Sequence, residues 1–277
     1  MIIDAHCHAW RRWPYEPAVP DPARGSVANL LWEMDRAGIA RAVVICAAIG
    51  GNDDNAGDVA AAGHRDRLAL FADLDCRWHA THQTPGGVDR LRALVDRLRP
   101  AGITFYLRED QPAAWLLSAD GDAFLAAIAA RGFVLSLACG PRQAETVVAA
   151  ALRHPRMPIL IHHLWRVRAG DEAALRAATD AARAPNLFVK LSGFGYGVDA
   201  GWDFPLQPVQ RVARALAAAY GPQRLVWGSD WPVSTRFMTH RQTLEIVRTH
   251  GPFDTPGERD AVLGGNMARL LDGWRPG

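Results

Sequence analysis

The chain has 277 residues, of which 49% are hydrophobic and 22% are charged, and its formal net charge is +2. This composition excludes a disordered, collagen-like or coiled-coil chain, because it supplies enough apolar side chains for a large core. Acids and bases are spread along the whole chain, which argues against a nucleic-acid partner, and no uncharged apolar run reaches the roughly 18 to 20 residues that cross a membrane.

Eight short apolar or β-branched segments recur along the chain and predict strands. They lie at residues 2–8, 42–48, 68–75, 102–107, 132–138, 158–164, 186–193 and 224–230. Most are apolar almost continuously, which is typical of strands that are buried on both faces in a parallel sheet.

Segments with helical spacing lie between these strands. They cover residues 26–37, 88–98, 120–130, 142–153, 171–183, 207–219 and 240–249, and a closing helix is expected at 258–272. This alternation predicts an α/β chain folded as one (β/α)8 TIM barrel over residues 1–277. An open doubly wound sheet is the competing architecture, but no G-x-G-x-x-G follows the first strand.

The start of the chain and the cysteines bear on its compartment. The first residues, MIIDAHCHAW, lack the basic and apolar regions of a signal peptide, and the four cysteines are widely spaced without a C-x-x-C pair. We therefore expect a cytoplasmic protein whose cysteines are reduced.

The first predicted strand carries three polar residues at a spacing of two, namely Asp4, His6 and His8. On a strand this spacing places all three on one face, which would point into the barrel mouth, while Ala5 and Cys7 would face the surrounding helices. Two imidazoles and a carboxylate can bind a divalent cation or polarise a carbonyl oxygen.

Two more strands end in polar residues. His162 and His163 end the sixth strand, where alternation allows only one of them to face the mouth. Asp230 ends the eighth strand, in the segment LVWGSDWPVS. A carboxylate beside imidazoles in the mouth has the reach and charge of a general base, or of one more metal ligand.

These motifs together resemble a known group of enzymes. D-x-H-x-H on the first strand, a histidine on the sixth, NLFVKLSG on the seventh, GSDWP on the eighth and a terminal GNMARLL are similar to the amidohydrolase superfamily. More narrowly they resemble the amidohydrolase 2 branch, which contains sugar-acid lactonases and 2-pyrone-4,6-dicarboxylate lactonase. The resemblance runs from Asp4 to about Leu271 and implies a barrel hydrolase whose catalytic residues are His6, His8, His163 and Asp230.

The chain departs from the pattern of that branch at two places. Where the branch usually has DHLG on strand six, this chain has HHLW at 162–165, so His163 matches the functional histidine and His162 replaces an acid. Where strand four usually carries GVR, this chain has GIT at 102–104 and lacks that arginine. Arg108 lies close enough in sequence to take over its anion contact.

The resemblance also bears on how many metal ions the site could hold. Superfamily members with two metals use a carboxylated lysine on strand four and a histidine on strand five, and this chain has neither at 102–107 or 132–139. We therefore expect no binuclear centre. The sequence is compatible with one divalent cation, such as zinc, on His6, His8 and Asp230, and equally with a metal-free site.

Lys190, in the seventh strand, is the only lysine of the chain. Burial could lower its pKa enough for Schiff-base chemistry, but we favour a point charge that pairs with a carboxylate and orients the site, because the family motif carries VKLSG without imine chemistry. Further candidates for substrate binding follow predicted strands, and the set comprises Tyr106, Arg108, Lys190, His79 and Arg11.

The hypothesis from the sequence is a hydrolase that opens a small lactone ring, from a sugar acid or an intermediate of aromatic degradation. Asp230 would activate a water molecule, and His163 with His6 and His8, or a cation that they hold, would stabilise the oxyanion. Two alternatives are a metal-dependent decarboxylase of the same superfamily and a barrel that binds a ligand without catalysis.

Overall fold

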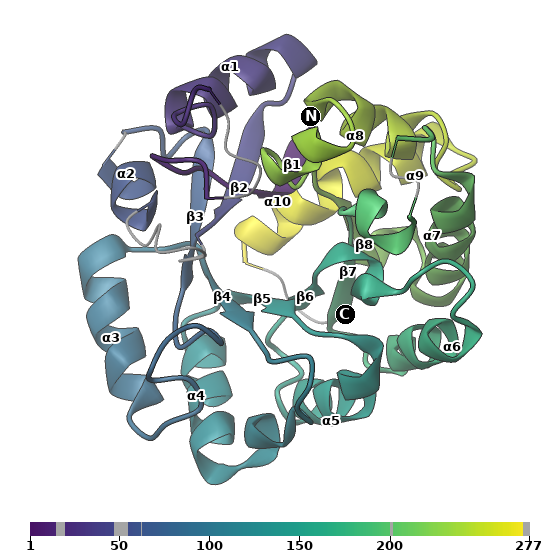
Figure 1. Ribbon diagram of the computed structural model, residues 1–277. Helices are drawn as coiled ribbons and strands as arrows, with labels where there is room; N and C mark the ends of the chain where they lie inside the picture. Colours follow the sequence, from purple (N-terminus) through teal and green to yellow (C-terminus); the bar gives the residue numbers. More distant parts are fainter. Residues whose placement is uncertain (15–19, 47–54, 62, 200–201, 274–277) are drawn as a thin grey trace.

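The computed structural model describes residues 1–14, 20–46, 55–61, 63–199 and 202–273, and it has the architecture that the sequence predicts (Figure 1). Eight parallel strands form one sheet in the order β1 to β8, each paired with the next strand of the chain. The strands are β1 (Ile3–Cys7), β2 (Arg41–Ile45), β3 (Leu68–Asp73), β4 (Gly102–Tyr106), β5 (Val134–Ala138), β6 (Ile159–Ile161), β7 (Leu187–Leu191) and β8 (Leu225–Trp227). The predicted (β/α)8 barrel is confirmed.

Helices surround the strands on the outside of the barrel (Figure 1). They are α1 (Val27–Ala37), α2 (Asn55–Ala61), α3 (Gly87–Leu98), α4 (Ala119–Ala130), α5 (Ala144–Arg153), α6 (Glu172–Asp180), α7 (Gln207–Tyr220) and α8 (His240–Arg248). The sequence did not predict α2, because its residues NAGDVAA offer few large apolar side chains to mark a helical face. Among the described residues, no helix is long and apolar enough to cross a membrane.

The predicted closing helix is divided into three parts. It consists of α9 (Pro256–Asp260), a π-helical segment at Ala261–Gly265 and α10 (Asn266–Leu271). Met267 and Leu270 of α10 pack with the side chains inside the barrel, so the tail packs on the barrel as expected.

Two layers of apolar side chains form the core. On β5, for example, Leu135 and Leu137 pack with the layer between the sheet and the helices, whereas Val134 and Ala138 join the cluster inside the barrel. The four cysteines are buried and free, as expected, and burial is the main cause that raises the pKa of each thiol.

The barrel closes between its first and last strands at their carboxyl ends. The backbone N–H of Asp230 donates to the carbonyl of His6 over 2.7 Å, and the N–H of His8 donates to the carbonyl of Trp231 over 2.6 Å. The backbone of His6, His8 and Asp230 therefore helps to close the barrel, and the side chains of the same three residues form part of the candidate site.

Candidate active site

A β-bulge in β1 decides which of its side chains point into the barrel. The pairing of β1 with β2 shifts register between Asp4 and Cys7, as happens where a strand holds one extra residue. Ala5 therefore lies inside the barrel, His6 and His8 point to the same interior, and Cys7 packs toward the helices. We predicted that Asp4, His6 and His8 share the inner face and that Ala5 faces the helices. This is wrong for Asp4, which does not point into the barrel, and for Ala5, which does.

Asp4 instead joins the two strands that carry the site. Its carboxylate accepts hydrogen bonds from the backbone N–H groups of His6, at 3.0 Å, and Ser229, at 2.8 Å, and from the Ser229 hydroxyl. Nε2 of His240, on α8, lies 3.5 Å from the same carboxylate. Asp4 thus fixes the end of β1 to the turn that presents Asp230.

Asp230 is the centre of the candidate site. Its side chain is buried, and Oδ1 lies 3.4 Å from Nε2 of His6, 3.3 Å from Nε2 of His8 and 4.0 Å from Nε2 of His163. The hydroxyl of Tyr196 donates a hydrogen bond to the other carboxylate oxygen. The structure therefore brings together the four residues that the sequence placed in catalytic roles, and adds a tyrosine.

Hydrogen bonds on the far side of the imidazoles orient them toward Asp230. Nδ1 of His8 lies 2.7 Å from the carbonyl oxygen of Ile45, which can only accept, so Nδ1 carries the proton and a neutral His8 turns its Nε2 lone pair to Asp230. Nδ1 of His163 lies 2.9 Å from the Ser192 hydroxyl. Nε2 of His6 is buried without a hydrogen-bond partner among the described residues.

This arrangement fits one divalent cation. Two acceptor atoms that face each other at 3.3 Å, as Nε2 of His8 and Oδ1 of Asp230 do, need a positive charge between them. His6, His8 and Asp230 bring ligand atoms within 4.8 Å of one another, and two imidazole nitrogens with one carboxylate oxygen are donors that zinc accepts. Nε2 of His163 lies 4.0 Å from the same carboxylate oxygen. The contacts to Ile45 and Ser192 are the supporting hydrogen bonds that metal-binding histidines commonly make.

The protonation states are set chiefly by burial. Burial lowers the pKa of His6 well below its ordinary value and that of His163 to about 4, so both imidazoles are neutral near pH 7. Burial alone would raise the pKa of Asp230, but attraction to His163, the contact with His8 and the hydrogen bond from Tyr196 outweigh it and leave the pKa below its ordinary value. Asp230 is therefore an ionised proton acceptor.

Lys190 lies beneath the imidazoles, inside the barrel. Its Nζ is 3.0 Å from Nδ1 of His6 and 2.7 Å from the Ser136 hydroxyl, which in turn lies 2.7 Å from Nε2 of His162. Burial lowers the pKa of Lys190 to about 7, while attraction to Asp4 opposes the shift. We predicted that Lys190 pairs with a carboxylate, and this is wrong. Among the described residues, its Nζ contacts an imidazole and a hydroxyl instead.

Both histidines at the end of β6 belong to the site. The ring centroids of His162 and His163 lie 4.6 and 4.5 Å from that of His6, so the prediction that only one faces the interior is wrong. Alternation along β6 turns His162 inward, and a left-handed backbone that begins at His163, with φ of 49°, turns the second ring inward as well. Left-handed residues other than glycine are strained, and such strain is frequent at functional sites.

The predicted substrate-binding residues divide into two groups. Tyr106 and Lys190 are buried in the wall of the site, and the Tyr106 ring lies 5.1 Å from the His162 ring. The other three are more exposed: Arg108 is on the loop after β4, Nε2 of His79 lies 3.6 Å from Asp73, and Arg11 pairs with Asp58 of α2. Residues 15–19, between β1 and α1, lie outside the described residues.

Sequence reasoning missed four residues beside the site, namely Tyr196, Ser136, Ser192 and Arg166. Ser136 offered a signal, because it is the one polar residue in the apolar run VLSLA of β5. Tyr196 lies in the stretch 194–206, which the sequence marks as a loop following a strand. Nothing in the sequence indicated the left-handed backbone from His163 to Arg166, which places Arg166 near Tyr106 and Tyr196.

Comparison with known proteins gives the family of the chain. Residues 3–273 match the profile of the amidohydrolase family. The chain belongs to the amidohydrolase family. This membership confirms the resemblance drawn from the motifs.

Two curated relatives of this amidohydrolase are lactonases. The chain is 28% identical over 234 residues to L-fucono-1,5-lactonase of Burkholderia multivorans, a match that covers 76% of this chain and 78% of that protein. It is 34% identical over 143 residues to L-fucono-1,5-lactonase of Burkholderia ambifaria, a match that spans 49% of either chain, about half the length of that relative. The lactonase branch that the motifs suggested is therefore supported.

A solved structure shows the same fold. A crystal structure of an amidohydrolase from Burkholderia multivorans with bound zinc superposes with a TM-score of 0.78 and 24% identity. The superposition covers 98% of this chain and 99% of that one. It confirms the barrel over nearly the whole length of this amidohydrolase.

Proposed function

We propose that this amidohydrolase opens the ring of a small lactone by hydrolysis of its ester bond. The observation that carries the proposal is the convergence of Nε2 of His6, His8 and His163 on one oxygen of the buried, ionised Asp230. The lactonase names of the two curated relatives support the same reaction class.

Asp230 acts as general base in this proposal. Its carboxylate takes a proton from a water molecule as the oxygen of that water attacks the lactone carbonyl carbon, and the carbonyl oxygen becomes an oxyanion. The tetrahedral intermediate collapses, the bond from the carbonyl carbon to the ring oxygen breaks, and Asp230 returns the proton to the departing alkoxide. The hydroxyl of Tyr196 holds the second carboxylate oxygen and so fixes the direction of the first.

His6, His8 and Asp230 would hold a divalent cation if the enzyme uses one. A bound cation supplies Lewis-acid polarisation of the carbonyl and makes water more acidic. The rings are held in place in either case, because His8 donates to the Ile45 carbonyl, His163 bonds with the Ser192 hydroxyl and His6 bonds with the Lys190 Nζ.

A lactone panel tests the proposal. Purified enzyme, with and without added zinc, is incubated with sugar-acid and unsaturated lactones, and acid release is followed with a pH indicator. We expect turnover of at least one lactone, no release of carbon dioxide from aromatic carboxylates, and loss of turnover in Asp230→Asn. Asp254→Asn, which changes an exposed carboxylate after α8, is the matched control.

Two results contradict the proposal. One is the absence of turnover on every lactone after zinc has been added. The other is an Asp230→Asn variant that is as active as the wild type.

A further inference from the structure

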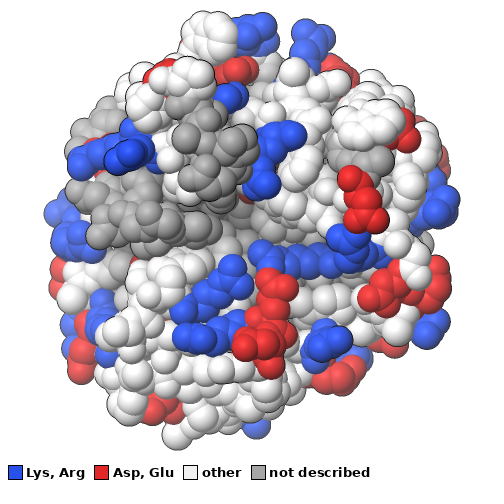
Figure 2. All heavy atoms as spheres, in the orientation of Figure 1, with Lys and Arg blue, Asp and Glu red and all other residues white. Residues whose placement is uncertain are grey.

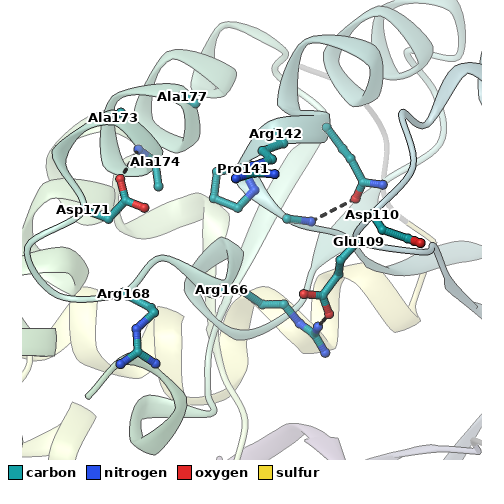
Figure 3. Close-up of a pocket in the computed structure, with 12 residues that line it drawn as sticks. Glu109, Asp110, Pro141, Arg142, Arg166, Arg168, Asp171, Ala173, Ala174 and Ala177 are labelled. Carbon is teal, nitrogen blue, oxygen red and sulfur yellow. Dashed lines mark hydrogen bonds and ion pairs between the residues drawn. The ribbon is translucent and has the colours of Figure 1, made fainter. Parts of the chain in front are cut away.

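A large cavity lies between the segments that follow β4, β5 and β6, and Arg166, three residues after His163, is part of its lining (Figure 3). Its volume is about 740 Å³, and its polar lining includes Glu109, Arg142, Arg166 and Arg168. A second, more open hollow of about 520 Å³ is lined by Arg77, Trp78, Arg108, Glu109 and Asp110. Glu109 therefore lies on the boundary between the two hollows.

Glu109 is shared by two guanidinium groups. Figure 3 shows the side chains of Glu109 and Arg166 pointing toward each other, and the same oxygen of Glu109 lies 3.6 Å from Nη1 of Arg77. One carboxylate therefore faces two permanent positive charges. The lining of the larger cavity is mixed in charge, since Arg142, Arg166 and Arg168 stand with Glu109, Asp110 and Asp171.

The two members of the main pair differ in how firmly they are held. The side chain of Arg166 is only 28% exposed, and it follows Leu164 and Trp165, which are buried. The Glu109 side chain is 51% exposed and lies on the loop after β4. Arg166 is thus the more buried member of the pair, and Glu109 can rotate into solvent when another carboxylate takes its place beside Arg166.

Arg166 is also close to the reacting groups. Burial lowers the pKa of its guanidinium, while attraction to Tyr106, Tyr196 and Asp230 counteracts the shift. Tyr106 and Tyr196 stand beside His162 and His163, with ring centroids at 5.1 and 5.3 Å. A substrate held by Arg166 would therefore reach the imidazoles, and the guanidinium would offset its repulsion by Asp230.

We propose that Arg166, assisted by Arg77, binds a carboxylate of the substrate, and that Glu109 occupies this subsite when no substrate is present. The substrate class is then a lactone that bears a carboxylate, displacing Glu109 as it enters. This inference rests on the proposed lactone hydrolysis for the substrate class, but the subsite itself can be tested without turnover. The planar fork of arginine suits carboxylates, and the same two guanidinium groups already bind one in Glu109.

Figure 2 shows basic and acidic side chains gathered near the centre of this face, over the ends of β4 to β6.

Titration calorimetry with succinate as the probe, and with succinamide as its uncharged match, tests the subsite. In Glu109→Gln, which removes the internal competitor, we expect succinate to bind about fivefold more tightly, a gain typical of breaking a partly exposed ion pair. In Arg166→Gln and Arg77→Gln we expect binding to weaken, by about tenfold and about threefold respectively. Succinamide binding should change in none of them.

Arg97→Gln, on the exposed side of α3, is the control for a simple loss of positive charge and should bind succinate as the wild type does. If Arg166→Gln unfolds at a lower temperature, Arg77→Gln and Glu109→Gln still test the subsite. The proposal is overturned if succinate does not bind, if both arginine variants bind it as the wild type does, or if Glu109→Gln binds it no more tightly.

Kinetics separate this inference from the proposed function. On carboxylated lactones, Glu109→Gln should lower KM about fivefold, and the ratio of KM on carboxylated lactones to KM on uncharged lactones should fall by the same factor. If succinate binding follows the expected order while no lactone is turned over, the subsite stands and lactone hydrolysis fails. If lactones are turned over but the variants bind succinate alike, the hydrolysis stands and the subsite fails.

Discussion

Two buried aspartates follow strands of the same barrel, and their surroundings differ in kind. Asp75 follows β3 and Asp230 follows β8, both have a left-handed backbone, and their residues are 2% and 1% exposed. Asp75 accepts hydrogen bonds from Nε and Nη2 of Arg90 at 2.8 to 3.0 Å and from the Thr81 hydroxyl at 2.7 Å. Asp230 faces three imidazoles and the Tyr196 hydroxyl.

The neighbouring groups explain why one carboxylate is structural and the other is reactive. A guanidinium keeps its charge at every physiological pH, so the negative charge of Asp75 is permanently compensated and the pair holds the loop after β3 to α3. Neutral imidazoles compensate Asp230 only when they share a proton or a cation with it. Burial is equal at the two positions, and the type of neighbour sets the role.

The largest expected effect separates the two positions by activity. Asp230→Asn should lower kcat by roughly 10³-fold, because the amide cannot accept the proton of the attacking water. Its unfolding temperature should stay within about 2 °C of the wild type, since no fixed cation loses its partner. Steady-state kinetics on the best lactone, together with calorimetric unfolding, check both values, and a large fall in stability would remove the contrast with Asp75.

The converse substitution should affect stability alone. Asp75→Asn leaves Arg90 without its carboxylate, and because the Arg90 side chain is 29% exposed we expect a loss of about 2 kcal/mol, below the range for a fully buried pair. Denaturant unfolding measures this loss, and kcat per folded molecule should equal that of the wild type. A loss of kcat at unchanged stability would show that the loop after β3 takes part in the reaction.

The sequence allowed the barrel to be predicted because strands buried on both faces leave near-continuous apolar runs, as in β2 and β7. It also indicated His6, His8, His163 and Asp230, since each is polar where a buried strand ends. It failed at Asp4, because a bulge in β1 changes which side chains point inward. It also allowed only one inward histidine after β6, because the left-handed turn that brings His163 in beside His162 leaves no local signal. Such departures arise from contacts between strands far apart in the chain, which local periodicity does not record.

The two hydroxyls that contact these carboxylates allow a finer comparison. Tyr196→Phe removes the hydrogen bond to Asp230 and should lower kcat about tenfold, because the carboxylate is then held less firmly in the direction of the water. KM should change less than twofold, since the hydroxyl is already engaged with Asp230. Kinetics at saturating substrate measure the effect, and an unchanged kcat would mean that the imidazoles alone orient Asp230.

Thr81→Val makes the matching change at Asp75 and has the smallest expected effect. It keeps the shape of the side chain but removes one hydrogen bond to a carboxylate that Arg90 still binds, so unfolding should become easier by about 1 kcal/mol. In a protein of this size that loss lowers the unfolding temperature by roughly 2 to 4 °C. Activity should be unchanged, because Arg90 alone keeps Asp75 compensated. If Thr81→Val instead lowered kcat as Tyr196→Phe is expected to do, the loop after β3 would have to move with the site, and the division between a structural and a reactive aspartate would fail.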